Sequence, residues 1–272
     1  MNYDARRAAE YWSAARHATG DELAAVLSLG EPPAVNRAYD TWETGLLLAS
    51  LPATSVARAL DLGAGVGRVS ERLARRVGRL ACADLAAGML DRLRHRLHAA
   101  GIPEGAYDRI RHRADQNPYR DGSFDLVVCV GLLEHLPETA RGRALEEVAR
   151  VLRPGGWLAL VLNNAESRFL GDPNDNPYRL AEQRENGYFC GVVDARSLQI
   201  DASRWFETTP LGSNLIYSLH RHAARSLPES ARALAALEPF FSAAARWDVA
   251  LRPLEGMARV AADHHLHLWR RR

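Results

Sequence analysis

Short apolar runs alternate with helical segments through the middle of the chain, and this alternation restricts the fold more than any other feature. The runs cover residues 59–62, 80–83, 124–130 and 157–162, with a weaker one at 109–113. Segments with a helical period lie between them, at residues 69–77, 89–99 and 143–152. Strands that are apolar on both faces and alternate with helices belong to parallel sheets. We therefore expect an α/β fold with a doubly wound, mostly parallel sheet.

The alternating part extends over residues 51–162, and the flanking segments differ from it. Residues 1–50 have a patchy helical period, which predicts an N-terminal helical cap. Residues 163–205 begin with a polar, turn-rich stretch that is too long for an ordinary connection, and this indicates a substrate lid inserted after the fifth strand. Residues 206–272 are expected to complete the sheet. The elements predicted there are strands at 215–219 and 264–269 and a helix at 230–246.

The composition is that of a folded protein with a mixed surface, with 47% hydrophobic residues and a net charge of +2 over 272 residues. No apolar run approaches the roughly 20 residues of a membrane span, and the first residues lack the apolar segment of a secretory signal. The cysteines Cys82, Cys129 and Cys190 are too scattered for a disulfide framework or a Cys-x-x-Cys metal site. We expect a cytoplasmic protein without a membrane partner. The arginine clusters are expected to be solvated helix faces, so we expect no nucleic-acid partner.

Every one of the 35 residues counted as Lys or Arg is an arginine. Schiff-base enzymes, phosphate-loop nucleotide hydrolases and dehydrogenases with a Tyr-Lys pair each depend on a lysine amine. The absence of lysine therefore excludes these classes of function.

The first apolar run leads into the turn Asp61-Leu62-Gly63-Ala64-Gly65-Val66-Gly67-Arg68, and a helical segment starts directly after it. Glycines allow a sharp turn and a close approach of ligand to backbone, and the N–H groups that begin a helix favour partial negative charge. Asp84 ends the second run, where a carboxylate can accept hydrogen bonds from both hydroxyls of a ribose. Together these features predict a nucleoside site.

The glycine spacing argues against a dinucleotide. The fingerprint Gly-x-Gly-x-x-Gly, counted from Gly63, requires a glycine where this chain has Arg68. The cradle for a pyrophosphate is therefore incomplete.

The glycine turn resembles the Asp-x-Gly-x-Gly-x-Gly first motif of class I S-adenosylmethionine-dependent methyltransferases, and of their small-molecule group with ubiquinone-type and antibiotic-biosynthetic members. The similarity extends from about residue 55 to 165. It includes the second motif at residues 83–90, the lead into the fourth strand at 121–127, the segment after that strand at 131–136 and the turn before the fifth strand at 151–157. The resemblance implies a Rossmann-like, seven-stranded fold and S-adenosylmethionine as cofactor.

The same resemblance implies roles for individual residues. The glycine turn would pass under the methionine moiety, Asp84 would bind the ribose, and Asp115 would face the adenine amino group. The implied cofactor-binding residues are Asp61, Gly63, Ala64, Gly65, Gly67, Asp84, Leu85, Met89, Asp115, Gln116 and Val130, with Tyr39 from the preceding helix packed over the methionine.

His135, just beyond the fourth strand, is the best placed candidate for a general base at the carboxyl edge of the sheet. The alternative interpretation is a structural histidine that hydrogen-bonds the neighbouring loop. Substrate recognition is expected from aromatic and polar side chains in the flanking segments. These candidates are Tyr11, Trp12, Glu134, Asn163, Asn164, Arg168 and Tyr188. The pairs His220/His222 and His265/His267 have too few further ligands nearby, so we predict no metal site.

The predicted function is methyl transfer from S-adenosylmethionine to O, N or C of a small metabolite, in bacterial secondary metabolism such as antibiotic biosynthesis. Two alternatives stay open. One is an enzyme of the same fold that uses the cofactor site for cyclisation, elimination or other non-methyl chemistry, and the other is a non-catalytic partner subunit. A homodimer is a possible assembly.

Overall fold

The computed structural model describes most of the sheet and the helices that cover it. The described residues are 3–14, 22–27, 32–52, 55–164, 188–191, 193–208, 216, 218–219, 228, 247–248 and 262–272, with the backbone of 209–213. Several predictions lie outside them. These are the helix at 230–246, most of the polar stretch after residue 164, Arg168, and the pair His220/His222.

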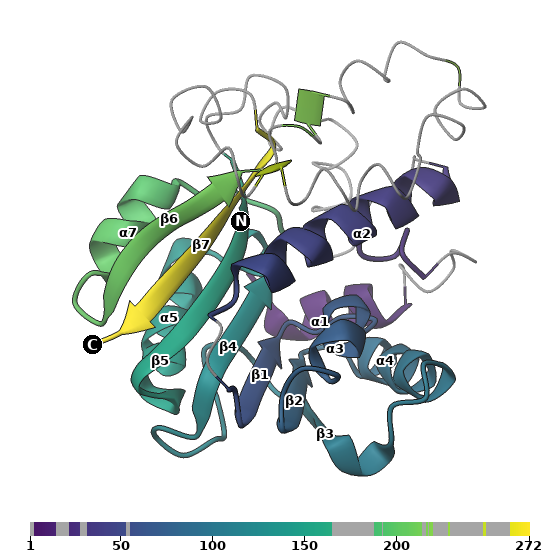
Figure 1. Cartoon of the computed structure of the whole chain (residues 1–272), viewed down its shortest axis with the longest axis horizontal. Coiled ribbons are helices and arrows are strands. Elements are labelled where there is room, and N and C mark those ends of the chain that lie inside the picture. Colours follow the sequence, from purple (N-terminus) through teal and green to yellow (C-terminus); the bar gives the residue numbers. More distant parts are fainter. Residues whose placement is uncertain are drawn as a thin grey trace.

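A seven-stranded sheet forms the centre of the molecule, in the strand order β3-β2-β1-β4-β5-β7-β6 (Figure 1). Its strands are β1 (Arg58–Leu62), β2 (Arg79–Asp84), β3 (Tyr107–Arg111), β4 (Phe124–Val130), β5 (Leu152–Asn163), β6 (Phe206–Ser213) and β7 (His264–Arg271). The first five strands are parallel to one another, and β7 is antiparallel to both β5 and β6. The prediction of a mostly parallel, seven-stranded α/β fold is confirmed.

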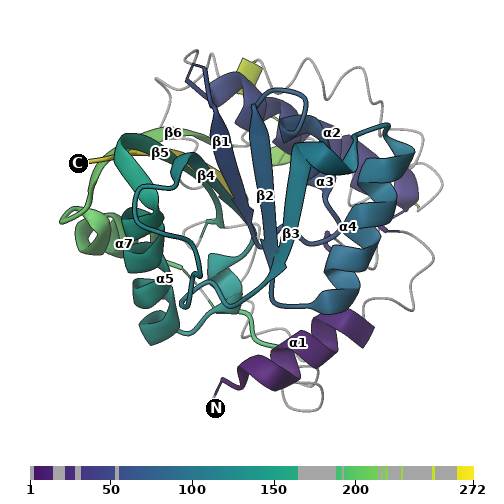
Figure 2. The same ribbon diagram turned by 90° about the horizontal axis from the view of Figure 1, so that it is seen from below.

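Helices cover both faces of this sheet (Figure 2). The described helices are α1 (Ala5–Ala14), α2 (Pro33–Ser50), α3 (Arg68–Leu73), α4 (Ala87–Ala99), α5 (Glu138–Val151) and α7 (Ala195–Ala202), with short 3-10 turns η2 (Glu104–Ala106) and η3 (Leu133–His135). Successive residues of β1 point to opposite faces, so Ala59 packs with the cluster under α2, α3 and α4, and Leu60 packs with the cluster under α5 and α7. Both clusters are buried, which explains why the central strands are apolar throughout.

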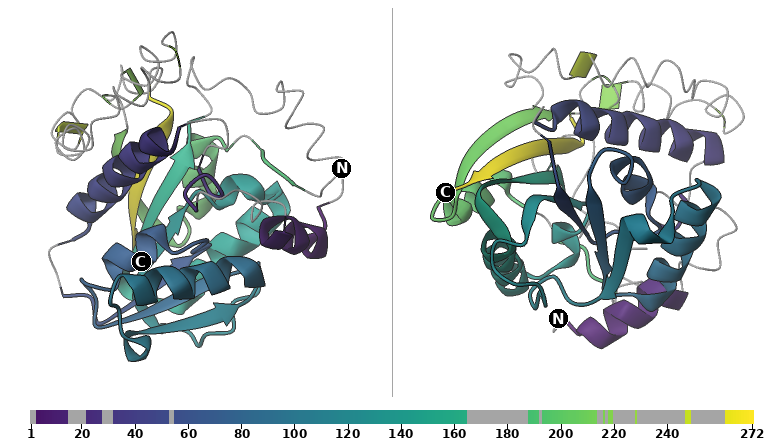
Figure 3. Two further views of the ribbon diagram at one scale, coloured as in Figure 1. Left: turned by 90° about the vertical axis from the view of Figure 1, so that its right-hand side faces the viewer. Right: turned by 60° about the horizontal axis from the view of Figure 1, so that its bottom comes forward.

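Helix α1 differs from the other helices in its position. It packs against α4, at the end of the sheet where the strands β1 to β4 finish, and not on a face of the sheet (Figure 3). The predicted N-terminal cap therefore divides into α1 at the strand ends and α2 on one face.

Two of the predicted strands, at residues 215–219 and 109–113, differ from the structure. The strand predicted at 215–219 is wrong, because Ile216, Ser218 and Leu219 are helical. Among the described residues, the strand before β7 is instead β6, which lies at the edge of the sheet and shifts register between Pro210 and Gly212. A strand with Pro and Gly lacks an alternating pattern, and sheet edges are where such residues are tolerated. Strand β3 begins two residues earlier than predicted because Tyr107 belongs to the core.

A buried cluster of charges joins α2 to α3. The Arg68 guanidinium is ion-paired with Glu43 and lies 3.4 Å from Asp40, and Arg72 donates to the same Asp40 over 2.9 Å. Tyr39 donates from Oη to Glu43 over 2.7 Å. Because Arg68 is the first residue of α3, this cluster holds the helix that follows the glycine turn against α2.

In the described part of the chain, no helix has the combined length and apolar character that a bilayer crossing demands.

The charge cluster generates a prediction about stability. Removing one partner of a buried ion pair leaves the others uncompensated and costs about 3 kcal/mol. We therefore expect Arg68→Met to lower the free energy of unfolding by about 3 kcal/mol, measured by urea denaturation. Arg94→Met, an exposed site on α4, serves as the matched control and should change it by less than about 0.5 kcal/mol. Equal effects of the two substitutions would contradict a stabilising role of the cluster.

Candidate functional site

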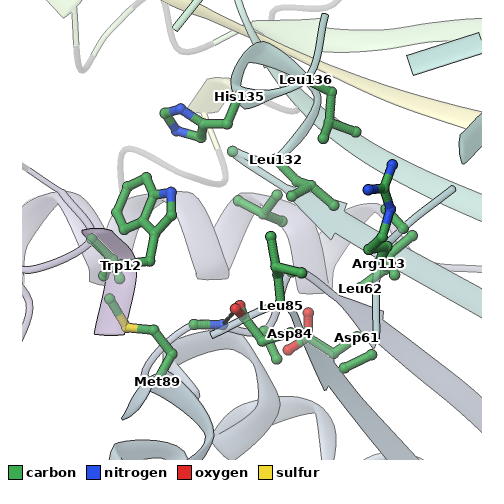
Figure 4. A pocket seen from close by; sticks show the side chains of 18 of the residues that line it. Trp12, Asp61, Leu62, Asp84, Leu85, Met89, Arg113, Leu132, His135 and Leu136 are labelled. Atoms are coloured by element: carbon green, nitrogen blue, oxygen red, sulfur yellow. Dashed lines mark hydrogen bonds between the residues drawn. The ribbon is translucent and has the colours of Figure 1, made fainter. Parts of the chain in front are cut away.

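A pocket lies at the carboxyl ends of β1, β2, β3 and β4 (Figure 4). The turns after these strands form its floor, and α1 closes one side. In Figure 4 the carboxylates of Asp61 and Asp84 lie together, with Trp12 and His135 on one side and Arg113 on the other. Ligands of open α/β sheets bind in this position, at the point where the chain direction across the sheet reverses. Here that point lies between β1 and β4.

The glycine turn follows β1 and is folded back tightly. The amides of Gly63 and Ala64 both donate to the Ala83 carbonyl at the end of β2, over 2.8 and 2.9 Å. Gly63 and Gly67 have φ values of +78° and +81°. A Cβ at Gly67 would lie 2.8 Å from Cγ of Leu93, and one at Gly63 would lie 3.1 Å from Leu132. Glycine is therefore required for the turn itself, and it leaves the backbone open to the pocket.

Asp84 lies beside the turn, at the end of β2. Its Oδ2 accepts the amide of Gly65 over 2.9 Å, and its Oδ1 accepts the amide of Ala86 over 2.8 Å. Burial raises the pKa of Asp84 above its ordinary value, and these backbone hydrogen bonds oppose the rise. Each carboxylate oxygen can accept a further hydrogen bond. The two backbone contacts thus fix the carboxylate in an orientation in which it can bind a pair of hydroxyls.

Asp61 lies deeper, with 2% of its surface exposed. Burial raises its pKa to about 6, and the hydrogen bond from Ser70 Oγ, 2.6 Å long, and the charge of Arg68 act in the opposite direction. A carboxylate in this position attracts a cation, because it is buried and only partly compensated.

After β3, two arginines surround Asp115. Arg113 donates from Nε to Oδ1 and from Nη2 to Oδ2, both over 2.8 Å, and Arg143 donates to Oδ2 over 3.3 Å. The hydrogen bonds from Arg113 lower the pKa of Asp115. Arg113 and Asp115 both line the pocket.

His135 lies in the 3-10 turn η3 after β4, among aromatic rings. Its Nδ1 is 2.8 Å from the carbonyl oxygen of Phe189. A carbonyl only accepts, so Nδ1 carries the proton and the neutral ring has its lone pair on Nε2. The Trp12 ring lies at 5.0 Å and the Tyr188 ring at 5.5 Å between centroids. These contacts hold the imidazole in one orientation at the pocket wall.

The structure brings most of the predicted site residues together. Those that line the pocket are Trp12, Asp61, Gly63, Ala64, Gly65, Asp84, Leu85, Met89, Asp115, Val130 and His135. Gly67 and Gln116 adjoin it without lining it. Glu134 belongs to the turn η3 after β4 and is buried, and Tyr11 and Tyr188 pack on each other and on Trp12.

Three other predicted residues lie away from the pocket. Tyr39 lies in the core between α2 and the sheet face, where its hydroxyl donates to Glu43 and lies 3.3 Å from His264. Asn163 ends β5 and pairs with β7, and Asn164 is buried, donating from Nδ2 to the Ala262 carbonyl over 2.7 Å. Tyr39 lies away from the pocket because its helix, α2, covers a face of the sheet and not the carboxyl edge where the pocket lies.

Several residues that line the pocket were not predicted from the sequence. These are Tyr3, His112, Arg113, Leu132 and Arg68. For Arg113 a signal existed, since an arginine two residues before Asp115, just after a strand, can place both side chains together. Tyr3 carried no comparable signal, because only the packing of α1 at the strand ends brings it to the pocket.

The part of the chain that forms this pocket is similar to known methyltransferases. Residues 60–160 match the family model described as a methyltransferase domain. An uncharacterised methyltransferase of Mycobacterium tuberculosis is 41% identical over 118 residues, which are 43% of this chain and 44% of that protein. A ubiquinone biosynthesis O-methyltransferase of Xanthomonas oryzae is 38% identical over 115 residues, 42% of this chain and 46% of that protein.

The fold comparison extends further along the chain. The crystal structure of an S-adenosylmethionine-dependent methyltransferase from Mesorhizobium loti superposes with a TM-score of 0.56 at 19% identity, over 85% of this chain and 98% of the other. At this identity the likeness concerns the fold alone. The sequence match spans less than half the length of the curated relatives.

Asp61 generates a prediction about pH. Because its pKa is raised in the folded state from 3.8 to about 6, its contribution to stability is largest below pH 4 and is lost as the pH rises through about 6. Asp61→Asn removes this charge and should be more stable than wild type at pH 8, by up to roughly 3 kcal/mol, and no more stable at pH 4. Urea denaturation at both pH values measures this. Asp91→Asn, at an exposed site, is the control, and a pH-independent effect of Asp61→Asn would contradict the burial argument.

Proposed function

We propose that residues 60–160, which match the methyltransferase-domain family model, form a domain of the class I, Rossmann-like type, and that this chain binds S-adenosylmethionine and transfers its methyl group to O, N or C of a small metabolite. One observation carries the proposal. The glycine turn, the oriented carboxylate of Asp84 and the buried carboxylate of Asp61 line one pocket, within the segment that matches the family model.

The residues of this pocket fit the cofactor. A Cβ at Gly63 would crowd Leu132, so glycine keeps the backbone accessible. Asp84 would accept hydrogen bonds from the ribose hydroxyls, and Asp61 would face the ammonium group of the methionine moiety. When bound, S-adenosylmethionine would supply a methyl group on a sulfonium, whose carbon an acceptor atom attacks in line while the sulfur leaves as the thioether of S-adenosylhomocysteine. The protein's part is to orient the two reactants and to exclude water.

The acceptor is proposed to bind between α1 and the segment after β4. On this side the described lining is mainly apolar, with Trp12, Leu132 and Leu136, and His135 provides a titratable ring nitrogen. Apolar walls exclude water from the reacting atoms. With Nδ1 bonded to the Phe189 carbonyl, His135 has the tautomer in which Nε2 is basic, so it would take the proton of an acceptor hydroxyl.

We place the acceptor in bacterial secondary metabolism, such as antibiotic biosynthesis, and the protein in the cytoplasm, as a monomer or homodimer without a nucleic-acid partner. The bacterial source of the matched relatives supports the bacterial setting of this proposal. The aromatic lining of the acceptor side supports a small organic molecule over a polymer with a charged backbone.

Binding of the cofactor tests the first half of the proposal. Calorimetric titration of wild type with S-adenosylmethionine and S-adenosylhomocysteine should give a single site. Asp84→Ala should weaken it at least about tenfold, because the loss of hydrogen bonds to a charged group costs about 1.5–3 kcal/mol. Asp91→Ala, an exposed aspartate of α4, is the control and should bind like wild type. Absence of binding to wild type would overturn the proposal.

Product analysis tests the second half. The protein is incubated with S-adenosylmethionine labelled in its methyl group and with fractionated bacterial metabolites, and the products are identified by mass. Transfer adds one CH₂ unit that carries the label. A product without the label would indicate non-methyl chemistry, and binding without any product until a second protein is added would indicate a partner subunit.

His135 gives a third test once an acceptor is known. If it removes a proton from a hydroxyl, His135→Gln should lower kcat by about 10²–10⁴ and abolish the acidic limb of the pH–rate profile. The affinity for S-adenosylhomocysteine should be unchanged. His95→Gln, at an exposed site of α4, is the control. An unaltered pH profile would assign His135 to a structural role.

A further inference from the structure

The order of the strands gives the direction in which a nucleoside cofactor would lie, and this inference rests on the proposed function. Strand β2, which carries Asp84, lies between β1 and β3 in the sheet. If the ribose binds at Asp84, the part of the ligand on one side of the ribose lies at the glycine turn after β1. The part on the other side lies at residues 112–115 after β3, which also line the pocket. The base would therefore contact this second segment.

Of the two charged side chains in this segment, the Arg113 guanidinium is more exposed than the Asp115 carboxylate. The side chain of Asp115 is only 5% exposed, and both of its oxygens are engaged by Arg113, with Arg143 on Oδ2 as well. The Arg113 side chain is 34% exposed. It uses Nε and Nη2 for Asp115, and its Nη1 has no acceptor within hydrogen-bond distance among the described residues. Arg113 thus covers the carboxylate, lines the pocket and keeps one donor nitrogen, Nη1, that Asp115 does not use.

We infer that Arg113, held in place by Asp115, is the specificity-determining contact to the base of the cofactor. A guanidinium only donates hydrogen bonds, so it cannot bond the amino group at C6 of adenine, which also donates. It can donate to the ring nitrogens N3 or N7, which accept in adenine and in hypoxanthine alike, and its plane can stack on either base. The site therefore reads the purine ring and does not select the amino group at C6.

The test compares two ligands that differ only at C6. They are S-adenosylhomocysteine and S-inosylhomocysteine, titrated calorimetrically into wild type, Arg113→Met, Arg113→Lys and the control Arg120→Met. Arg120 is exposed and lies outside the pocket lining. Wild type should bind the two ligands within about threefold of each other. Arg113→Met should weaken both by about tenfold or more, the loss expected for one charge-assisted hydrogen bond. Arg113→Lys keeps the positive charge but lacks the planar guanidinium, so its affinity for both ligands should lie between those of wild type and Arg113→Met.

Each other outcome has a separate meaning. A preference of wild type for the adenosyl ligand of tenfold or more would assign recognition of the amino group to Asp115 and overturn the inference. Equal binding of S-adenosylhomocysteine to wild type, Arg113→Met and Arg113→Lys would overturn it as well, while the proposed function stands. Failure of wild type to bind either ligand would instead overturn the proposed function. If Arg113→Met does not fold, as judged by thermal unfolding, the ligand comparison on wild type and Arg113→Lys still decides.

Discussion

Strands that are buried on both faces constrain everything else in this structure. Such strands have no face left for solvent, so helices must cover both sides of the sheet, here α2, α3 and α4 on one side and α5 and α7 on the other. Leu60 and Ala59 of β1 therefore belong to different cores. The chain winds outward from β1 through β2 to β3, then returns to β4 on the other side of β1. The connection after β1 leads to one side of the sheet and the connection after β4 leads to the other side. The carboxyl ends of β1 and β4 are therefore left uncovered, and the pocket forms there.

The pocket combines groups that a fold selected for stability alone would avoid. Asp61 and Asp84 are both desolvated enough for their pKa values to rise, and at Asp61 the hydrogen bond from Ser70 and the charge of Arg68 oppose that rise. Arg68 in turn is held by Glu43 and Asp40 from α2. A chain of charges thus extends from a helix on the sheet face to the floor of the pocket. Buried carboxylates with incomplete compensation favour a cationic or hydroxyl-rich ligand, and this agrees with the proposed cofactor.

The sequence predicted well those parts of the site that depend on local conformation. The glycine turn and Asp84 follow directly from strand ends, and strand ends are visible as the limits of apolar runs. It predicted poorly the residues whose position depends on packing between distant segments. Tyr39 was expected over the cofactor, but α2 packs on the face of the sheet, so its hydroxyl meets Glu43 and His264 instead. Strand β6 was missed because an edge strand with Pro210 and Gly212 has no alternation to reveal it.

The sequence by itself determined the class of fold, the winding of the parallel strands and the place of the glycine turn, because these follow from hydrophobic periodicity and from backbone conformations that only glycine adopts readily. It also excluded functions that need a lysine. Only the tertiary structure decided that Arg113 covers Asp115, that Trp12 and Tyr188 hold His135, and that Arg68 is anchored on α2. Each of these contacts, except the first, joins residues far apart in the chain. Even for the first, spacing alone does not say which side chain faces the pocket, because burial and competing ion pairs decide it.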